Sequence, residues 1–182
     1  MIFVTDAAGQ CVYISQEWTA LTGQEAANAL GQGWLTCVHQ DDRQTVIDTL
    51  DLALWTIAEF SMRYRLLKAD GVLCWVGSGG VPSFGIEGNR FIGYLGSITE
   101  LAEGATDTII AYGDVERFVP PPQHPATRSN CTLDLIADHL ILAHTLIEGD
   151  GGKEALPDLR NALFKIGRAL AARTKQLVRT VN

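Results

Sequence analysis

The chain has 182 residues, of which 47% are hydrophobic and 19% are charged, and its formal net charge is −7 at pH 7. This balance predicts a globular protein with one good-sized domain and an appendage, or with two small domains. The negative charge argues against nucleic acid and anionic membrane surfaces as partners, because both would repel it. The sequence has neither a basic, apolar leader nor 18 consecutive apolar residues, so we expect a cytoplasmic protein with no membrane span.

The four cysteines are widely spaced, and no two of them form a Cys-x-x-Cys pair. That spacing fits neither a zinc site nor a dense disulfide framework. We therefore expect reduced thiols of the cytosolic kind and no metal site. The cysteines are Cys11, Cys37, Cys74 and Cys131.

The first 58 residues predict two strands followed by three helices. Residues 2–15 form two short β-branched and aromatic runs around a turn at Asp6–Gly9. Two short helices are expected at 16–21 and 24–30, each followed by a glycine that ends it. A longer helix is expected at 43–58, where apolar residues recur at helical spacing at Val46, Ile47, Leu50, Leu54 and Ile57.

The hydrophobic period then changes from 3.6 to two. Apolar and polar residues alternate along Phe60–Leu66, and the tight turn Ala69–Gly71 leads into a second strand at Val72–Val76. A loop is expected around Pro82 and Gly85–Gly88, followed by a last strand at 90–99. Two strands, short helices and three more strands predict an α+β fold with one five-stranded antiparallel sheet and helices on one face.

The chain after residue 102 has a different pattern. Residues 103–130 contain several prolines and predict a linker, and 131–182 predict two helices that form a hairpin. Each helix has one narrow apolar seam, which must be covered by a second copy in a four-helix bundle or by the outer face of the sheet. The pattern favours a homodimer. The seam residues that would form its interface are Leu133, Ile136, Leu140, Leu159, Leu163 and Ile166.

Several motifs in residues 1–102 resemble, in order, the PAS domain family. The resemblance is to the subgroup with the pattern tG…lG.gW…vHPdDr, although Gln40 stands where proline is usual. It implies a five-stranded sheet whose concave face and helices enclose a small core or a ligand cavity, and a sensory or dimerising role. The matching segments are 18–23, 30–35, 38–43, 64–71, 75–76 and 93–99.

The resemblance allows two cofactors to be considered. Haem-binding members use an axial ligand such as a histidine on the long helix, and residues 43–58 contain none. In the light-sensing branch a reactive cysteine follows the second short helix, but here Trp34 holds that position and Cys37 comes three residues later. We therefore expect no cofactor, while an unidentified small ligand stays open. The candidate lining residues, which would otherwise fill the core, are Trp55, Phe60, Met62, Tyr64 and Trp75.

No set of nucleophile, base and orienting residue can be found in the sequence, and no output domain is recognisable in it. The sequence therefore predicts a non-catalytic regulator of signal transduction that acts through protein–protein interaction. Its expected partner is a signalling component such as a histidine kinase or a regulator. The alternative is a degenerate histidine-kinase dimerisation or phosphotransfer unit that uses His139 or His144, whereas His39 has a structural role near a helix start.

Overall fold

The computed structural model describes residues 1–85, 90–104 and 110–180. It shows the expected α+β fold, with one antiparallel sheet in the order β2-β1-β5-β4-β3-β6. The strands are β1 (Ile2–Thr5), β2 (Cys11–Ile14), β3 (Phe60–Leu67), β4 (Leu73–Phe84), β5 (Phe91–Glu100) and β6 (Tyr112–Asp114). The helices are α1 (Glu17–Thr22), α2 (Ala26–Ala29), α3 (Arg43–Thr56), α4 (Thr132–Asp150) and α5 (Leu156–Thr180), with short 3₁₀ turns between some elements.

Strand β4 is longer than the sequence predicts. It continues through Pro82 to Phe84, so the expected loop around Pro82 is wrong, and residues 86–88 lie outside the described part of the chain. Strand β3 pairs with β4 only as far as Gly80, so Pro82 faces no partner strand on that side. The missing N–H of proline therefore costs no ladder hydrogen bond there.

The sheet has six strands and not five. The additional strand β6 comes from the expected linker and pairs with the outer edge of β3, with Tyr112 opposite Arg63 and Asp114 opposite Ser61. A three-residue strand with Gly113 at its centre has no hydrophobic alternation, so the sequence allowed either a short strand or a turn of helix at 106–112 and did not fix the bounds of β6. Residues 105–109 of that linker, and residues 181–182 of the expected helical segment, are outside the described residues.

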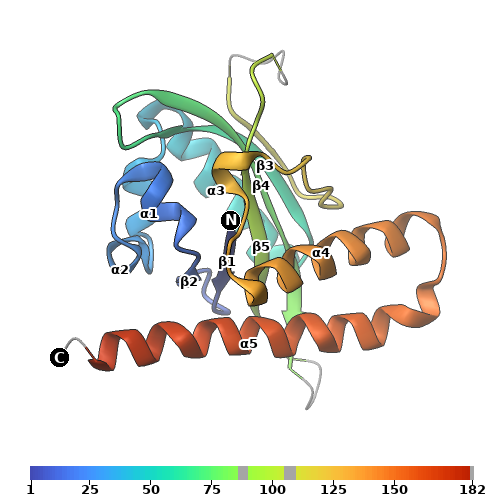
Figure 1. The fold of residues 1–182 in the computed structure, drawn as a ribbon. Coiled ribbons are helices and arrows are strands. Elements are labelled where there is room, and N and C mark those ends of the chain that lie inside the picture. The colour runs from blue at the N-terminus through green and yellow to red at the C-terminus, as the bar shows by residue number, and fades with distance from the viewer. Residues whose placement is uncertain (86–89, 105–109, 181–182) are drawn as a thin grey trace.

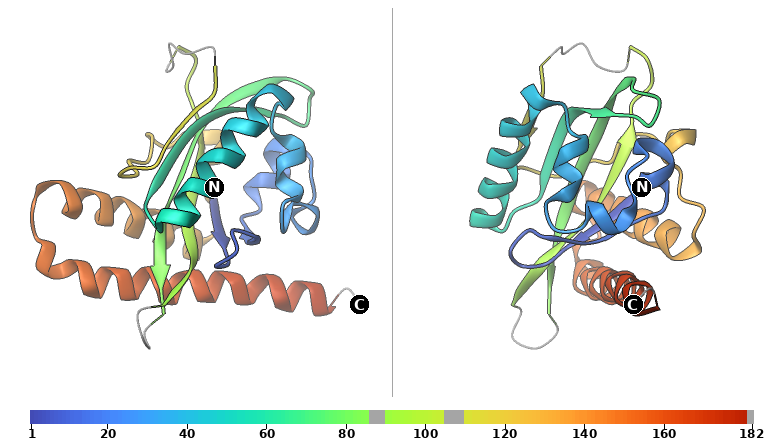
Figure 2. Two further views of the ribbon diagram at one scale, coloured as in Figure 1. Left: turned by 180° about the vertical axis from the view of Figure 1, so that it is seen from behind. Right: turned by 90° about the vertical axis from the view of Figure 1, so that its left-hand side faces the viewer.

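The sheet lies between two layers of helices, as Figures 1 and 2 show. Helices α1–α3 cover the inner face, and α4 with α5 covers part of the outer face. Sheet and hairpin share one apolar cluster on that outer side. Its buried members are Ile2, Val4, Tyr13, Val81, Leu95, Phe118, Ala137, Ile141, Leu163 and Leu170.

The hairpin therefore obtains apolar cover from its own chain. Leu163 is buried against the sheet, and Leu133, Leu140 and Ile166 pack around the same cluster. Leu159 is half-buried, while Ile136 points to solvent and is 40% exposed. The outer face of the sheet therefore covers most of these seams, as in the second of the two expected arrangements. The expected dimer interface depended on seams that only a second copy would cover.

Within the described residues, no helix combines the length and the apolar character that crossing a membrane requires.

Candidate functional site: an enclosed cavity backed by the helical pair

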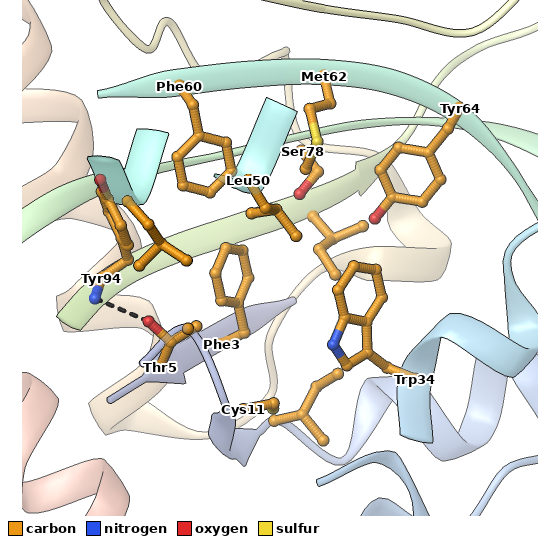
Figure 3. A pocket seen from close by; sticks show the side chains of 14 residues that line it. Phe3, Thr5, Cys11, Trp34, Leu50, Phe60, Met62, Tyr64, Ser78 and Tyr94 are labelled. Carbon is orange, nitrogen blue, oxygen red and sulfur yellow. Dashed lines mark hydrogen bonds between the residues drawn. The ribbon is translucent and has the colours of Figure 1, made fainter. Parts of the chain in front are cut away.

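A small apolar cavity lies between the inner face of the sheet and helix α3, and Figure 3 shows it from close by. Its volume is about 40 Å³. Three of the five candidate lining residues, Phe60, Met62 and Tyr64, line it from alternate positions of β3, as strand geometry requires. The other lining residues are Phe3, Thr5, Gly9, Cys11, Ile14, Trp34, Leu50, Leu54, Ser78, Tyr94 and Ile98.

The two remaining candidates do not reach the cavity. Trp55 is 83% exposed, because the inward positions of α3 are Leu50 and Leu54, and the next residue is rotated by about 100°. Trp75 lies on the outer face of β4, where the guanidinium of Arg65 lies 5.6 Å from its ring centroid. Aromatic character alone suggested both residues, and it does not say which face a side chain takes.

The register of β3 and β4 decides the position of Trp75. Tyr64 pairs with Val76 and Met62 pairs with Ser78, so even-numbered residues of β4 face the cavity and odd-numbered ones face outward. Ser78 follows from this register as a lining residue that the sequence analysis missed. The signal was present in the strand alternation, but the Gly-rich segment 77–80 obscured it.

Few polar groups reach the cavity wall, and those of Tyr94, Thr5 and Cys11 already form hydrogen bonds. The hydroxyl of Tyr94 lies 2.6 Å from the Ala53 carbonyl and 3.0 Å from the Ala58 carbonyl, which fastens β5 to the end of α3. The backbone N–H of Tyr94 donates to Thr5 Oγ1 at 2.9 Å. The Cys11 thiol donates to the Tyr13 carbonyl, and burial raises the pKa of this thiol to about 12. Cys11 is therefore protonated at neutral pH and is a poor nucleophile.

The size of the cavity limits what it can hold. One water-sized probe needs about 10–15 Å³, so the space accepts roughly three such volumes. Sites for drug-sized ligands usually measure about 300–1,000 Å³, several times the volume of this cavity. Trp34 fills part of the wall, and Cys37 is not among the lining residues.

Directly behind the cavity, a chain of polar contacts connects the sheet to the helical pair. Glu59 precedes the cavity residue Phe60, and its Oε2 accepts a hydrogen bond from Phe118 N–H at 2.8 Å. Its Oε1 lies 3.5 Å from Nδ1 of the buried His144. Arg160 Nε donates to the other ring nitrogen of His144 at 3.3 Å. The residue before β3, helix α4 and helix α5 therefore meet at one polar cluster, in which His144 is buried, Glu59 is half-buried and Arg160 is exposed.

Burial controls the protonation of this polar cluster. It raises the pKa of Glu59, and the hydrogen bond from Phe118 only partly offsets the rise. Burial also lowers the pKa of His144, and the neighbouring Arg160 charge adds to the effect. Neutral His144 with a proton on Nδ1 suits both neighbours, because Nε2 then accepts from Arg160 while Nδ1–H faces Glu59.

Phe118 contacts both strand β4 and helix α4. Its ring packs on the outer face of β4 over Gly79, where any side chain would overlap it. Its carbonyl accepts a hydrogen bond from the hydroxyl of Thr145 on α4 at 2.7 Å. The Gly-rich segment of β4 is therefore a close-packing site for the linker.

The histidines proposed for phosphotransfer differ in access. His144 is buried between Arg160 and Glu59, while His139 is exposed on α4. His39 has a local structural role, because its Nδ1 accepts a hydrogen bond from the Asp41 N–H at the start of a 3₁₀ turn. No group of His, Cys, Asp and Glu residues suited to a metal ion occurs in the part of the chain that the structure describes.

Comparison with known proteins supports the fold. Residues 11–95 match the family described as PAS fold. The chain is 39% identical over 103 residues to the uncharacterized protein y4lL of Sinorhizobium fredii (strain NBRC 101917 / NGR234). That match covers 57% of this chain and only 12% of the relative, so the chain spans a small part of that protein's length.

Two solved structures extend the comparison. The N-terminal domain of a diguanylate cyclase with a PAS/PAC sensor from Marinobacter aquaeolei has a TM-score of 0.51 and 16% identity, covering 58% of this chain and 97% of its own. The Rhodobacter sphaeroides LOV protein has a TM-score of 0.51 and 17% identity, covering 98% of this chain and 90% of its own. The second likeness therefore includes the C-terminal helices. With the sheet, the helical layer and the cavity in place, residues 11–95 have the PAS fold of the matching family, and PAS domains are sensory signal-transduction modules.

Proposed function

We propose that the chain is a non-catalytic sensory module of the cytoplasm that admits a small apolar ligand to the cavity and transmits its presence to the α4–α5 hairpin. One observation carries this proposal. Ser78, Tyr94 and Ile98 line the cavity from β4 and β5. On the opposite face of the same two strands, Val81 and Leu95 pack against the hairpin. A shift of these strands therefore changes both the cavity wall and the contacts with the hairpin.

The contacts behind the cavity supply a route. A ligand that displaces Phe60 moves the adjacent Glu59, and Glu59 holds Phe118 and faces His144. Packed interfaces respond to such small shifts by changing between discrete arrangements, because their interiors do not deform smoothly. The position of the hairpin then changes, and with it the surface that a partner protein can contact.

The absence of catalysis in this proposal rests on the chemistry of the site. The cavity thiol is held protonated by its raised pKa, and both this thiol and the Tyr94 hydroxyl already bond to backbone carbonyls. Enzymatic nucleophiles need an adjacent base or a lowered pKa. The small cavity likewise supports a ligand of a few heavy atoms and no tightly held chromophore.

The partner in this proposal is a protein of a signalling pathway, such as a histidine kinase or a regulator, or a second copy of the chain. The net charge of −7 opposes association with nucleic acid and with anionic lipid. We do not extend the proposal to phosphotransfer. His144 would need the contacts to Arg160 and Glu59 to open before a kinase could reach it.

Xenon is a suitable probe because it is apolar and small. We expect xenon pressure to shift the methyl NMR signals of Met62 and Ile98 in the cavity, and with them those of Ile141 and Leu163 at the hairpin contact. Leu54→Phe, which fills the cavity from α3, should abolish both sets of shifts. Leu52→Phe, on the exposed side of the same helix, should leave them intact. Cavity shifts without hairpin shifts would refute transmission, and no cavity shifts would refute the ligand site.

A further inference from the structure

An open groove lies between helices α1 and α2 on one side and the C-terminal part of α5 on the other, elements that Figure 1 shows next to one another. Its volume is about 600 Å³, within the range of about 300–1,000 Å³ that is usual for small-molecule sites. Of the described residues, only Ile14 lines both this groove and the enclosed cavity. The groove is therefore a second candidate site, and the proposed function does not use it.

Two carboxylates from distant parts of the chain line the groove. Glu17 on α1 is 8% exposed, and Asp134 near the start of α4 is 1% exposed. Asp134 Oδ1 accepts a hydrogen bond from the Tyr13 hydroxyl at 2.7 Å, and Glu17 Oε1 accepts one from Asn130 N–H at 2.9 Å. The second oxygen of Glu17, Oε2, is buried and has no hydrogen-bond partner among the described residues. An acceptor left unpaired in this way costs free energy, so it favours a ligand that brings a donor.

The Glu17 carboxylate is charged at neutral pH. Burial acts to raise its pKa, but hydrogen bonds, led by the one from Asn130 N–H, outweigh burial and hold that pKa below its ordinary value. The Met1 ammonium lies near this carboxylate, yet its hydrogen bonds go to the carbonyls of Ile98 and Thr127. A cationic donor in the groove therefore meets a negative charge whose second oxygen the chain has not paired.

Arg173 on α5 brings the opposite charge to the same groove. Its side chain is exposed, and its Nη1 donates to Cys131 Sγ at 2.9 Å. A guanidinium carries five N–H donors, so this one contact leaves several for a ligand carboxylate. Burial raises the pKa of Asp134, and the positive charge of Arg173 opposes the rise, so the two groups are close enough to act on one small ligand.

The groove also has an apolar wall of mostly small side chains. Ala20 contributes to it from α1, Ala26 and Ala27 from α2, and Leu30 from the end of α2. Alanine side chains leave space beside the helices, and burying apolar surface against them is favourable for a short aliphatic group. Carboxylates, a guanidinium and an apolar wall together define the chemistry of the ligand.

We propose that this groove binds a free amino acid with an aliphatic side chain. Glu17 and Asp134 bind its ammonium group, Arg173 binds its carboxylate, and the side chain lies on the alanine wall. A simple amine or a simple carboxylic acid satisfies only one of the two charged parts, so the groove discriminates against both. Because the ligand contacts α1, α4 and α5 at once, it fastens the C-terminal part of α5 to the domain and gives the hairpin a second input.

Titration of the full chain with L-leucine, followed by methyl NMR, tests the proposal. A pH of about 6.5 keeps the α-ammonium group charged. We expect a dissociation constant on the order of 100 μM, since the ligand is small and the groove is open. The methyl signals of Ala20 and Leu30 should shift, while that of Met62, in the enclosed cavity, should not.

Two variants and a second ligand separate the roles of the charges. Arg173→Ala should weaken the binding of L-leucine at least about tenfold and leave that of L-leucinamide unchanged, because the amide has no carboxylate. Glu17→Gln should weaken the binding of both at least about tenfold, because both carry the ammonium group. Lys165→Ala and Glu25→Gln remove exposed charges that do not line the groove, and they should change neither affinity.

The side chain of the ligand has its own control. Glycine carries both charges without an aliphatic group, so it should bind at least about tenfold more weakly than L-leucine. Equal affinities for the two would show that the alanine wall does not contribute, and the aliphatic specificity would then be wrong.

Three further results would overturn the proposal: no binding of L-leucine up to about 10 mM, an Arg173→Ala variant that loses both ligands equally, or a Glu17→Gln variant that binds both as the unmodified protein does. Glu17→Gln keeps an acceptor for Asn130 N–H, and circular dichroism checks its fold. If that variant does not fold, Arg173→Ala at the surface still decides between the two ligands. If L-leucine does not bind while xenon still shifts the Met62 and Ile141 signals, this proposal alone is wrong and the proposed function stands.

Discussion

The two faces of the sheet are packed in different ways. On the inner face, large side chains surround a space that they do not fill, because the ring and hydroxyl of Tyr94 hold α3 at a fixed distance. On the outer face, the space is removed, because Gly77 and Gly79 allow Pro121 and Phe118 to lie directly on the backbone of β4. One strand thus carries a cavity on one side and a close-packed linker on the other. In the proposed function, the inner face senses the ligand and the outer face holds the α4–α5 hairpin in place.

Two adjacent glycines of β4 provide the strongest test of this comparison. A methyl group on Gly79 would overlap the Phe118 ring and the Phe60 carbonyl, whereas one on Gly80 meets its nearest atom, Phe60 Cε1, at 3.3 Å. We expect Gly79→Ala to lower the free energy of unfolding by about 3 kcal/mol and Gly80→Ala by less than about 1 kcal/mol. Urea unfolding measures both. Equal losses would show that the outer face is no more tightly packed than the inner one.

A second test compares two carboxylates, Asp42 and Glu59. Asp42 lies immediately before helix α3. Arg65 donates to it from Nε at 2.9 Å and from its backbone N–H at 2.8 Å. Burial acts to raise the pKa of Asp42, but the hydrogen bonds and charge of Arg65 outweigh it and hold that pKa below its ordinary value. We expect Asp42→Asn to cost about 2 kcal/mol at pH 7, the value of a hydrogen bond to a charged group.

The pH dependence of this loss has a definite sign. Because the folded pKa of Asp42 is depressed, its contribution is present above the unfolded value near 3.8 and disappears as pH falls through the folded value. The difference in the free energy of unfolding between Asp42→Asn and the unmodified protein should therefore be large at pH 7 and small near pH 3. Asp41→Asn is the control, since Asp41 is exposed and should change stability little. A loss that persists unchanged at low pH would contradict the ion-pair explanation.

Glu59 lies behind the cavity, and its contribution to stability should depend on pH with the opposite sign to that of Asp42. Its substitution should have the smallest effect on stability of the changes proposed here. Burial raises its pKa, so the stability it contributes is present below the unfolded value near 4.5 and is lost as pH rises through the folded value. Glu59→Gln keeps an acceptor for Phe118 N–H without the charge. We expect it to be slightly more stable than the unmodified protein at pH 7, with the difference shrinking toward pH 4. Thermal unfolding across this range checks it, and a Gln variant that is less stable at pH 7 would show that the charge itself holds the linker.

Much of the architecture could be predicted from the sequence because it depends on local signals. The alternation along Phe60–Leu66 indicated β3, the periodicity at Val46, Leu50 and Leu54 indicated α3, and the spaced motifs resembled the PAS family. For the same reason Phe60, Met62 and Tyr64 could be placed together on one face. Trp55 and Trp75 could not, because hydrophobicity does not report how far a helix is rotated or which register a Gly-rich strand adopts.

The sequence by itself determined most of the elements, their order, the resemblance to the PAS family and the presence of apolar seams on the last two helices. Only the tertiary structure decided which surface covers those seams, since the same leucines can pack on a sheet or on another chain with similar gain in buried area. It also decided that Gly79 would receive Phe118 and that His144 would be enclosed by Glu59 and Arg160. These contacts join residues far apart in the chain, and no local pattern specifies such pairings before the chain has folded.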